Sequence, residues 1–152
     1  MIEEVAMKRL ICLTLAILLL FCSCQSEQDA YAMLSEFVAA YGAEGVIYSP
    51  SLAEGKPGYL TQELVERIFL FTDGIGDNYA ILLNSHVTSV SECGIFVCDD
   101  DEERRRCEEV CLERVRILNS DNGFVKSKGR AVYYSTLSDS EKAERIFKEI
   151  IN

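Results

Sequence analysis

Residues 92–118 read ECGIFVCDDDEERRRCEEVCLERVRIL, and this stretch joins the two kinds of element on which the fold depends. After its initial glutamate the opening is apolar, which predicts a β-strand over Glu92–Cys98. Asp99–Glu103 then supplies a run of carboxylates, and carboxylates at a helix start stabilise the positive end of its dipole. Arg104–Leu118 follows and predicts a helix. A strand that runs into a helix in this way indicates a domain of mixed α and β structure.

Further strands are predicted on both sides of this stretch. Asn78–Asn84, NYAILLN, precedes it and is separated from it by a short polar link, which predicts an antiparallel pair. Phe124–Ser127 and Arg130–Ser135 flank a Lys128–Gly129 turn and predict a second hairpin.

Three more helices are predicted from apolar spacing and end signals. They lie at 29–41 with Gly42 as the stop, from 61 to near 72–74 with Thr61 as the cap, and at 138–151 with Ser138 as the cap. Residues 42–60 predict a loop, which holds one brief strand-like insert at 46–48. Together the elements predict an α+β fold, with an antiparallel sheet of about four strands and helices packed on one face.

The start of the chain is typical of an export signal. Met7–Cys24, MKRLICLTLAILLLFCSC, has two cations, an apolar run and small residues before its last cysteine, which is the layout of a signal peptide. The apolar run of about 12 residues is shorter than the ~20 that a membrane-spanning helix needs. Residues 1–6 carry two carboxylates, which suit an export leader badly, so we expect translation to start at Met7.

The end of this leader resembles a lipoprotein processing site. In Phe21-Cys22-Ser23-Cys24 a small residue precedes the cysteine, as such sites require, although Phe21 replaces the usual branched aliphatic residue. We expect lipidation of Cys24, with residues 1–24 as a helical signal peptide, 25–29 as a short tether and 30–152 as a single α+β domain. A leader that is simply cleaved or retained is the alternative. The predicted location is the extracytoplasmic face of the cell membrane, to which the lipid anchor or the uncleaved leader attaches the exported chain.

Composition limits the classes of partner. The chain has 152 residues, of which 49% are hydrophobic, enough for one domain with a core. It has 25 acidic and 15 basic residues and a net charge of −10, and such a surface repels phosphate groups. We therefore expect no nucleic-acid partner, while the protein or ligand partner is not indicated.

Four cysteines remain outside the leader, with the spacing C-x4-C and then C-x3-C; they are Cys93, Cys98, Cys107 and Cys111. Side chains alternate along a strand, so Cys93 and Cys98 should lie on opposite faces, which argues against one zinc ion held by all four. We expect buried or free thiols. One disulfide, between Cys98 and either Cys107 or Cys111, is the second interpretation, and metal binding is the least favoured.

The sequence contains no recognisable catalytic set. His86 is the only histidine and lies in the polar link between two predicted strands, where a solvated side chain is the ordinary outcome. Phosphate-binding loops, nucleophile elbows and zinc-protease motifs are absent from the sequence. We therefore predict no catalytic residue and no cofactor, and favour a protein that is not an enzyme.

Residues 59–151 resemble an uncharacterised domain of small bacterial lipoproteins. The resemblance rests on GYLT at 58–61 opening a helix, on ECGIFVCD running into a charged helix, and on a hairpin followed by SEKAERIFKEI. It implies an envelope-associated bacterial protein of α+β fold and carries over no catalytic residues. The hypothesis is a lipoprotein whose domain binds or scaffolds a partner. The alternative is a thiol-active or metal-binding envelope protein that uses its four cysteines.

Overall fold

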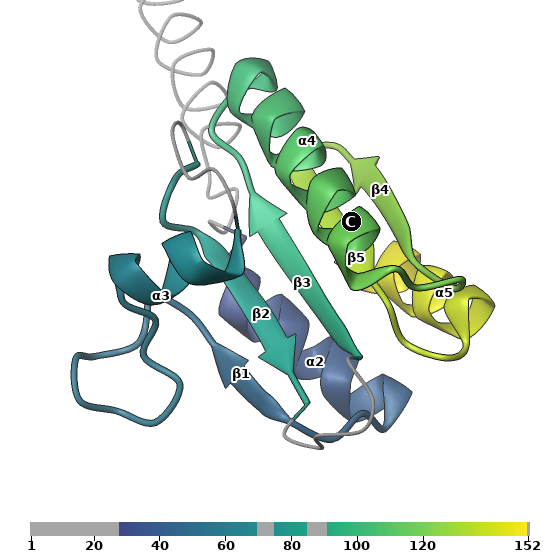
Figure 1. Ribbon diagram of the computed structural model, residues 1–152, viewed down its shortest axis with the longest axis horizontal. Helices are drawn as coiled ribbons and strands as arrows, with labels where there is room; N and C mark the ends of the chain where they lie inside the picture. Colours follow the sequence, from purple (N-terminus) through teal and green to yellow (C-terminus); the bar gives the residue numbers. More distant parts are fainter. Residues whose placement is uncertain (1–27, 70–74, 85–90, 152) are drawn as a thin grey trace, which may run out of the picture.

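The computed structural model describes residues 28–69, 75–84 and 91–151. Its helices and strands are shown in Figure 1. In chain order they are α2 (Ala30–Tyr41), β1 (Val46–Tyr48), α3 (Gln62–Ile68), β2 (Tyr79–Leu83), β3 (Glu92–Val97), α4 (Asp101–Leu118), β4 (Phe124–Lys128), β5 (Ala131–Ser135) and α5 (Ser140–Ile150). The predicted α+β class is confirmed.

The strands form one antiparallel sheet in the order β1-β2-β3-β5-β4. Both predicted hairpins are present, as the pairs β2–β3 and β4–β5. The brief insert at Val46–Tyr48 pairs with β2 and makes five strands, where about four were predicted. Helix α4 leads from β3 to β4, and β5 lies between these two strands, so the centre of the sheet joins segments far apart in the sequence.

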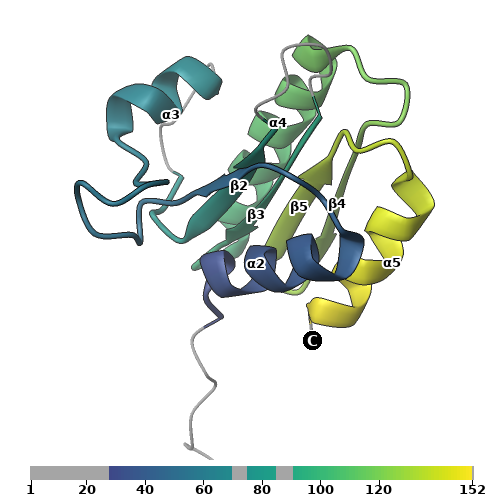
Figure 2. The same ribbon diagram turned by 90° about the horizontal axis from the view of Figure 1, so that it is seen from below.

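Helices cover both faces of the sheet, which differs from the prediction of one covered face. Figure 2 shows α2 and α5 on one side and α4 with α3 on the other. The reason is visible in β5, where all five residues are buried although their side chains alternate between faces. A strand that is buried on both sides needs cover on both sides.

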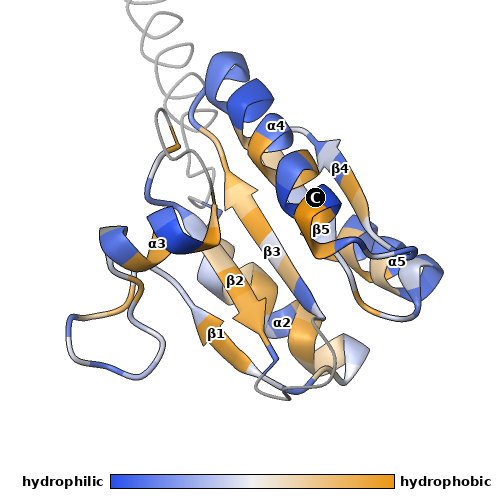
Figure 3. Cartoon of the chain, viewed as in Figure 1, coloured by the Kyte–Doolittle hydropathy of each residue, from blue (hydrophilic) through white to orange (hydrophobic). Residues whose placement is uncertain are grey.

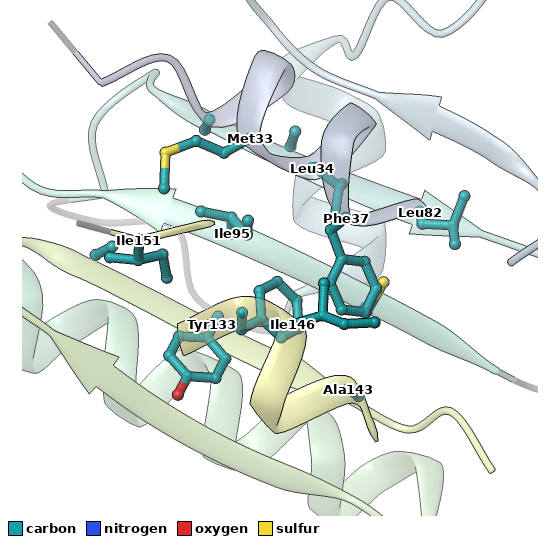
Figure 4. Close-up of a cluster of buried hydrophobic side chains, with 14 of the residues drawn as sticks. Met33, Leu34, Phe37, Leu82, Ile95, Tyr133, Ala143, Ile146 and Ile151 are labelled. Atoms are coloured by element: carbon teal, nitrogen blue, oxygen red, sulfur yellow. The ribbon is translucent and has the colours of Figure 1, made fainter. Parts of the chain in front are cut away.

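The first core lies between the sheet and the helices α2 and α5. Phe37 of α2 stacks on Phe147 of α5 with ring centroids 4.0 Å apart, and Tyr133 of β5 lies 4.5 Å from the same Phe147 ring. Figure 4 shows Phe37 and Tyr133 in one cluster with Leu82 of β2 and Ile95 of β3. Both phenylalanines are fully buried, so this stack joins the first and last described helices directly on one face of the sheet.

The second core lies between the opposite face and the helices α3 and α4. Phe69, directly after α3, meets Phe96 of β3 and Tyr134 of β5 edge to face at 5.6 and 6.3 Å. From α4 the side chains of Cys107, Val110 and Cys111 are buried. Figure 3 shows the hydrophobic sheet beneath α4 and the hydrophilic stretches of the helix.

Two of the predicted helix ends are confirmed. Gly42 ends α2 in the left-handed region, with φ of 77°, and its N–H donates to the carbonyl of Val38. Thr61 caps α3, because its hydroxyl accepts the N–H of Leu64 at 3.3 Å. Both positions therefore satisfy backbone groups that the helices leave unpaired.

Two other helices begin elsewhere than predicted. Helix α4 starts at Asp101, three residues early, because Asp100 accepts the N–H groups of Glu102 and Glu103 at 2.8 Å. Helix α5 is capped by Asp139, whose carboxylate accepts the N–H of Lys142, instead of by Ser138. In both cases the residue nearer the first turn supplies the acceptor.

The predicted signal helix and Cys24 lie in residues 1–27, outside the described residues. Across the ranges that the structure describes, no helix combines the length and apolar character that crossing a membrane requires.

Candidate functional site

A buried carboxylate lies beneath α4, at the start of β3. Glu92 is 2% exposed and forms a two-pronged ion pair with Arg114 of α4, with Nε–Oε1 at 2.6 Å and Nη2–Oε2 at 2.7 Å. The hydroxyl of Tyr134 donates to the same carboxylate at 2.9 Å. The Glu92 carboxylate therefore accepts three hydrogen bonds, two from Arg114 and one from Tyr134. These bonds connect α4 with the central strands β3 and β5.

A glycine makes room for this arrangement. In the β3–β5 register Gly94 lies opposite Tyr134, and a Cβ at Gly94 would lie 2.7 Å from Cε1 of that ring and 3.1 Å from the carbonyl oxygen of Ala80. Because Gly94 has no side chain, the ring of Tyr134 can lie across β3. Thr136 fixes the neighbouring backbone, because its hydroxyl accepts the N–H of Glu92 at 2.9 Å.

The electrostatics of Glu92, Arg114 and Tyr134 favour a structural role, in which these three side chains hold α4 against the sheet. They are called the α4 clip below. Burial would lower the pKa of Arg114, but its hydrogen bond to Glu92 and the charge of that carboxylate outweigh burial and raise it. Burial and the Glu92 charge raise the pKa of Tyr134 well above its ordinary value, so its hydroxyl stays a donor. The carboxylate is withdrawn from solvent and occupied, which makes it a poor acid or base toward a substrate.

Three of the four predicted cysteines meet beside this clip. Cys98, Cys107 and Cys111 belong to the second core, whereas Cys93 belongs to the first core on the other face of the sheet. The prediction that Cys93 and Cys98 face opposite sides is therefore confirmed. All four are free thiols and buried.

The surroundings of Cys93, Cys107 and Cys111 keep these three thiols protonated. A hydrogen bond with Cys98, followed by burial, raises the pKa of Cys107. Burial is the main cause that raises the pKa of Cys111 and of Cys93. The thiolate is the nucleophile and the metal ligand, so these groups are poorly prepared for either role. Among the described residues, no three or more histidine, cysteine or acidic side chains are placed to hold a metal ion.

The loop after β1 is closed at its base and protrudes beside α3 (Figure 1). The N–H of Ser49 donates to the carbonyl of Gly58 at 2.9 Å, and the N–H of Leu60 donates to the carbonyl of Ser49 at 3.2 Å. Gly58 has φ of 85°, and a Cβ there would lie 2.3 Å from the carbonyl oxygen of Ile47. Only glycine closes the loop this tightly against β1.

A hollow of about 420 Å³ lies at the base of this loop, on the α3 side. The residues that line it are mainly apolar or aromatic: Pro50, Tyr59, Leu60, Val65, Ile75, Gly76, Asp77 and Tyr79. Asp77 is the one charged side chain in this described lining. Burial and the charge of Asp77 raise the pKa of Tyr79 to about 12, so its hydroxyl is neutral at physiological pH. The loop at 42–60 therefore borders a hollow whose lining is mainly apolar and aromatic and contains the exposed carboxylate of Asp77.

A second, smaller hollow of about 320 Å³ adjoins the start of α2. It shares Pro50 and Asp77 with the first hollow and adds Gln28, Asp29, Ser51 and Asn78. Asn78 fixes this corner, because it accepts the N–H of Ala30 at 3.0 Å and donates to the carbonyl of Gln28 at 2.8 Å.

Sequence reasoning missed the ion pair of Glu92 and Arg114, whose partners are 22 residues apart. The available signal was one charged residue at the head of an otherwise apolar strand. His86 and the lipidation candidate Cys24 lie outside the described residues, so neither is placed near the site.

Comparison of the chain with protein-family models, curated proteins and solved structures found no match. The resemblance to the lipoprotein domain therefore stays a prediction.

Proposed function

We propose that this chain is a bacterial lipoprotein, held by a lipid on Cys24 at the extracytoplasmic face of the cell membrane, whose α+β domain binds a partner there. The observation that carries the proposal is the leader MKRLICLTLAILLLFCSC, which ends at Cys24 only five residues before Asp29. Asp29 is the N-cap of α2, so the folded domain begins almost directly after the candidate anchor. The family resemblance over 59–151 agrees with this proposal.

The short tether determines which end of the domain would face the membrane. Five residues reach about 18 Å at full extension, so Asp29 would remain within that distance of Cys24. Asn78 directly precedes β2, and its two hydrogen bonds hold the start of α2 against the beginning of that strand. Both hollows lie at this end, and they share Asp77.

The chemistry of the larger hollow favours a cationic group on an apolar stem. Asp77 supplies a carboxylate to the lining, and Tyr59 and Tyr79 supply aromatic rings to it. The face of a tyrosine ring attracts cations, and the half-buried Tyr59 is the more accessible of the two, because Tyr79 is buried and stacks on Phe96. The net charge of −10 adds a long-range attraction for cations. We therefore propose that the binding partner presents an alkylammonium group, as a lysine side chain does.

The anchor is tested by growing cells that express the full chain with an alkyne-tagged fatty acid. We expect label on the wild-type chain and in the membrane fraction, and loss of both in Cys24→Ala. The matched control, Cys22→Ala, changes a neighbouring leader cysteine and should keep the label. Unchanged labelling and membrane retention in Cys24→Ala would show that the lipoprotein assignment is wrong.

The binding role is tested by titrating the isotope-labelled chain with n-butylammonium and, separately, with butyrate. We expect amide shifts around Tyr59 and Tyr79 with the cation only, and weaker binding in Asp77→Asn. Asp121→Asn removes an exposed carboxylate from the turn after α4 and is the matched control. Equal responses to both probes, or shifts spread over the whole surface, would contradict a cation site in this hollow.

The burial of the four cysteines weighs against the thiol-active and metal-binding alternative. A catalytic or metal-binding thiol needs thiolate character and access, whereas burial raises the pKa of Cys93 and Cys111. Thiol counting and metal analysis of the folded chain test this alternative. Rapid modification of any of these four cysteines by a water-soluble maleimide, located by the masses of their tryptic peptides, or a stoichiometric bound metal, would restore it.

A further inference from the structure

The two hollows near the start of β2 share part of their walls. The larger, of about 420 Å³, and the smaller, of about 320 Å³, both have Pro50 and Asp77 in their linings. Each volume falls within the roughly 300–1,000 Å³ of small-molecule sites. A ligand group that pairs with the carboxylate of Asp77 can therefore extend into either hollow, or into both.

The backbone around Asp77 is fixed on both sides. Before it, the N–H of Gly76 donates to the carboxylate of Glu103 on α4 at 2.6 Å. After it, Asn78 holds the start of α2 through hydrogen bonds of 3.0 and 2.8 Å. Asp77 itself is exposed. Its carboxylate is thus offered to solvent from a fixed backbone, which lowers the entropy lost when a cation binds.

The larger hollow suits an apolar side chain. Pro50, Tyr59 and Ile75 are half-buried residues of its lining, so part of their apolar surface remains open to a ligand. Leu60 and Val65 lie deeper, because both are buried in the second core. An apolar group that enters this hollow is removed from water together with the surface that it covers, which favours binding.

The smaller hollow presents hydrogen-bond acceptors. The hydroxyl of Ser49 donates its hydrogen to the carbonyl of Tyr79 at 2.8 Å. Its 2.8 Å contact with the hydroxyl of Ser51 therefore uses the hydrogen of Ser51, whose oxygen is left with acceptor capacity only. Ser51 lines the smaller hollow together with Asp29, an exposed carboxylate that also only accepts. This hollow thus favours a ligand N–H group and disfavours a carboxylate.

We propose that the two hollows together bind the amino-terminal residue of a peptide whose first side chain is large and apolar. The α-ammonium pairs with Asp77, the side chain enters the larger hollow, and the first peptide N–H enters the smaller hollow. The inference rests on the cation site proposed above and states which ammonium occupies it. A lysine side chain carries its ammonium at the end of its stem, without a peptide bond beside it, and would fill one hollow only.

The test titrates the isotope-labelled full chain with small probes and follows its amide shifts at pH 6, where an α-amino group is protonated. Leucinamide carries the ammonium, the apolar side chain and an amide N–H. Free leucine replaces that N–H group by a carboxylate, Nα-acetyl-leucinamide lacks the ammonium, and n-butylammonium lacks the amide.

We expect leucinamide to shift amides in both linings, at Ser51 and at Tyr59. It should bind about fivefold more tightly than n-butylammonium, which is the effect of one net hydrogen bond. Leucine should bind about fivefold more weakly than leucinamide, because its carboxylate meets that of Asp29. Nα-acetyl-leucinamide should cause no shifts.

Asp29→Asn isolates the contribution of the smaller hollow. Asp29 is the N-cap of α2, and asparagine caps a helix about as well as aspartate does, so the start of α2 is kept. The variant should narrow the ratio between leucinamide and leucine from about fivefold to about twofold. Asp121→Asn is the matched control and should leave the ratio unchanged. An unchanged ratio in Asp29→Asn would overturn the placement of the peptide N–H in the smaller hollow.

The outcomes separate this inference from the cation site on which it rests. If leucinamide binds no more tightly than n-butylammonium while both responses require Asp77, the amino-terminal inference is overturned and the cation site stands. If leucinamide shifts only the larger hollow, the result is the same. If no probe binds, or if Nα-acetyl-leucinamide binds as tightly as leucinamide, both the inference and the cation site are overturned.

Discussion

The buried ion pair beneath α4 predicts an unusually costly substitution, Arg114→Met. The methionine keeps an apolar stem of similar length but removes both donors that Arg114 directs at Glu92. Only the hydroxyl of Tyr134 then remains as a side-chain donor to the carboxylate, which is 2% exposed. The Glu92 carboxylate would lose its charged partner and would not regain contact with water. The variant should therefore be strongly destabilised.

The expected loss is about 3–5 kcal/mol of unfolding free energy, the usual cost of breaking one side of a buried pair. With a urea slope near 2 kcal/mol/M, this moves the unfolding midpoint by roughly 2 M. The double variant Glu92→Leu/Arg114→Met removes both charges and should be more stable than Arg114→Met alone. A double-mutant cycle with Glu92→Leu then gives the coupling between the two residues.

The assay is urea unfolding followed by circular dichroism on the detergent-solubilised full chain. Arg116→Met is the matched control, because Arg116 lies on the same helix but pairs with Glu113 at the surface. We expect this control to unfold close to the wild type. A loss in Arg114→Met no larger than in Arg116→Met would refute the claim that the clip holds α4 to the sheet.

Three further variants or conditions test the packing around the site. Gly94→Ala should cost about 1–3 kcal/mol, because the new methyl group displaces the Tyr134 ring, and an unchanged urea midpoint would contradict the close approach of ring and strand. Phe147→Ala should cost about 3–5 kcal/mol in the same assay, since it removes the stack with Phe37, and a loss below 1 kcal/mol would show that α5 is not part of the core. Burial raises the pKa of Cys111, so this thiol stays protonated in the folded chain while the unfolded chain ionises near pH 8.5. Stability should therefore fall as the pH rises above that value, and Cys111→Ala should reduce the fall between pH 7 and 10; an equal fall in both chains would contradict the assignment.

Local patterns were sufficient to predict most elements. The apolar run of Glu92–Cys98 and the acidic stretch after it predicted β3 and the start of α4 within three residues. Thr61 and Gly42 marked helix ends correctly because caps act through neighbouring backbone groups. These features depend on residues within one turn of each other, which a single sequence displays directly.

The order of the strands in the sheet and the contacts between distant residues were harder to predict from the sequence. The pairing of β3 with β5, past the nearer strand β4, depends on how α4 crosses the sheet, which no local pattern specifies. The cover on both faces is indicated by the sequence AVYYS of β5, which carries apolar or aromatic residues on both of its alternating sets of positions. The bond between Glu92 and Arg114 follows from that topology, so it became visible only once α4 was placed.

The measurement that tests the central claim most directly is the mass of the amino-terminal tryptic peptide of the chain purified from bacterial membranes. The account predicts a peptide that begins at Cys24, ends at Arg67 because trypsin does not cleave between Lys56 and Pro57, and carries the added mass of a diacylglyceryl group. An unmodified Cys24 inside a longer peptide that retains the leader, or an amino terminus elsewhere without lipid, would contradict it.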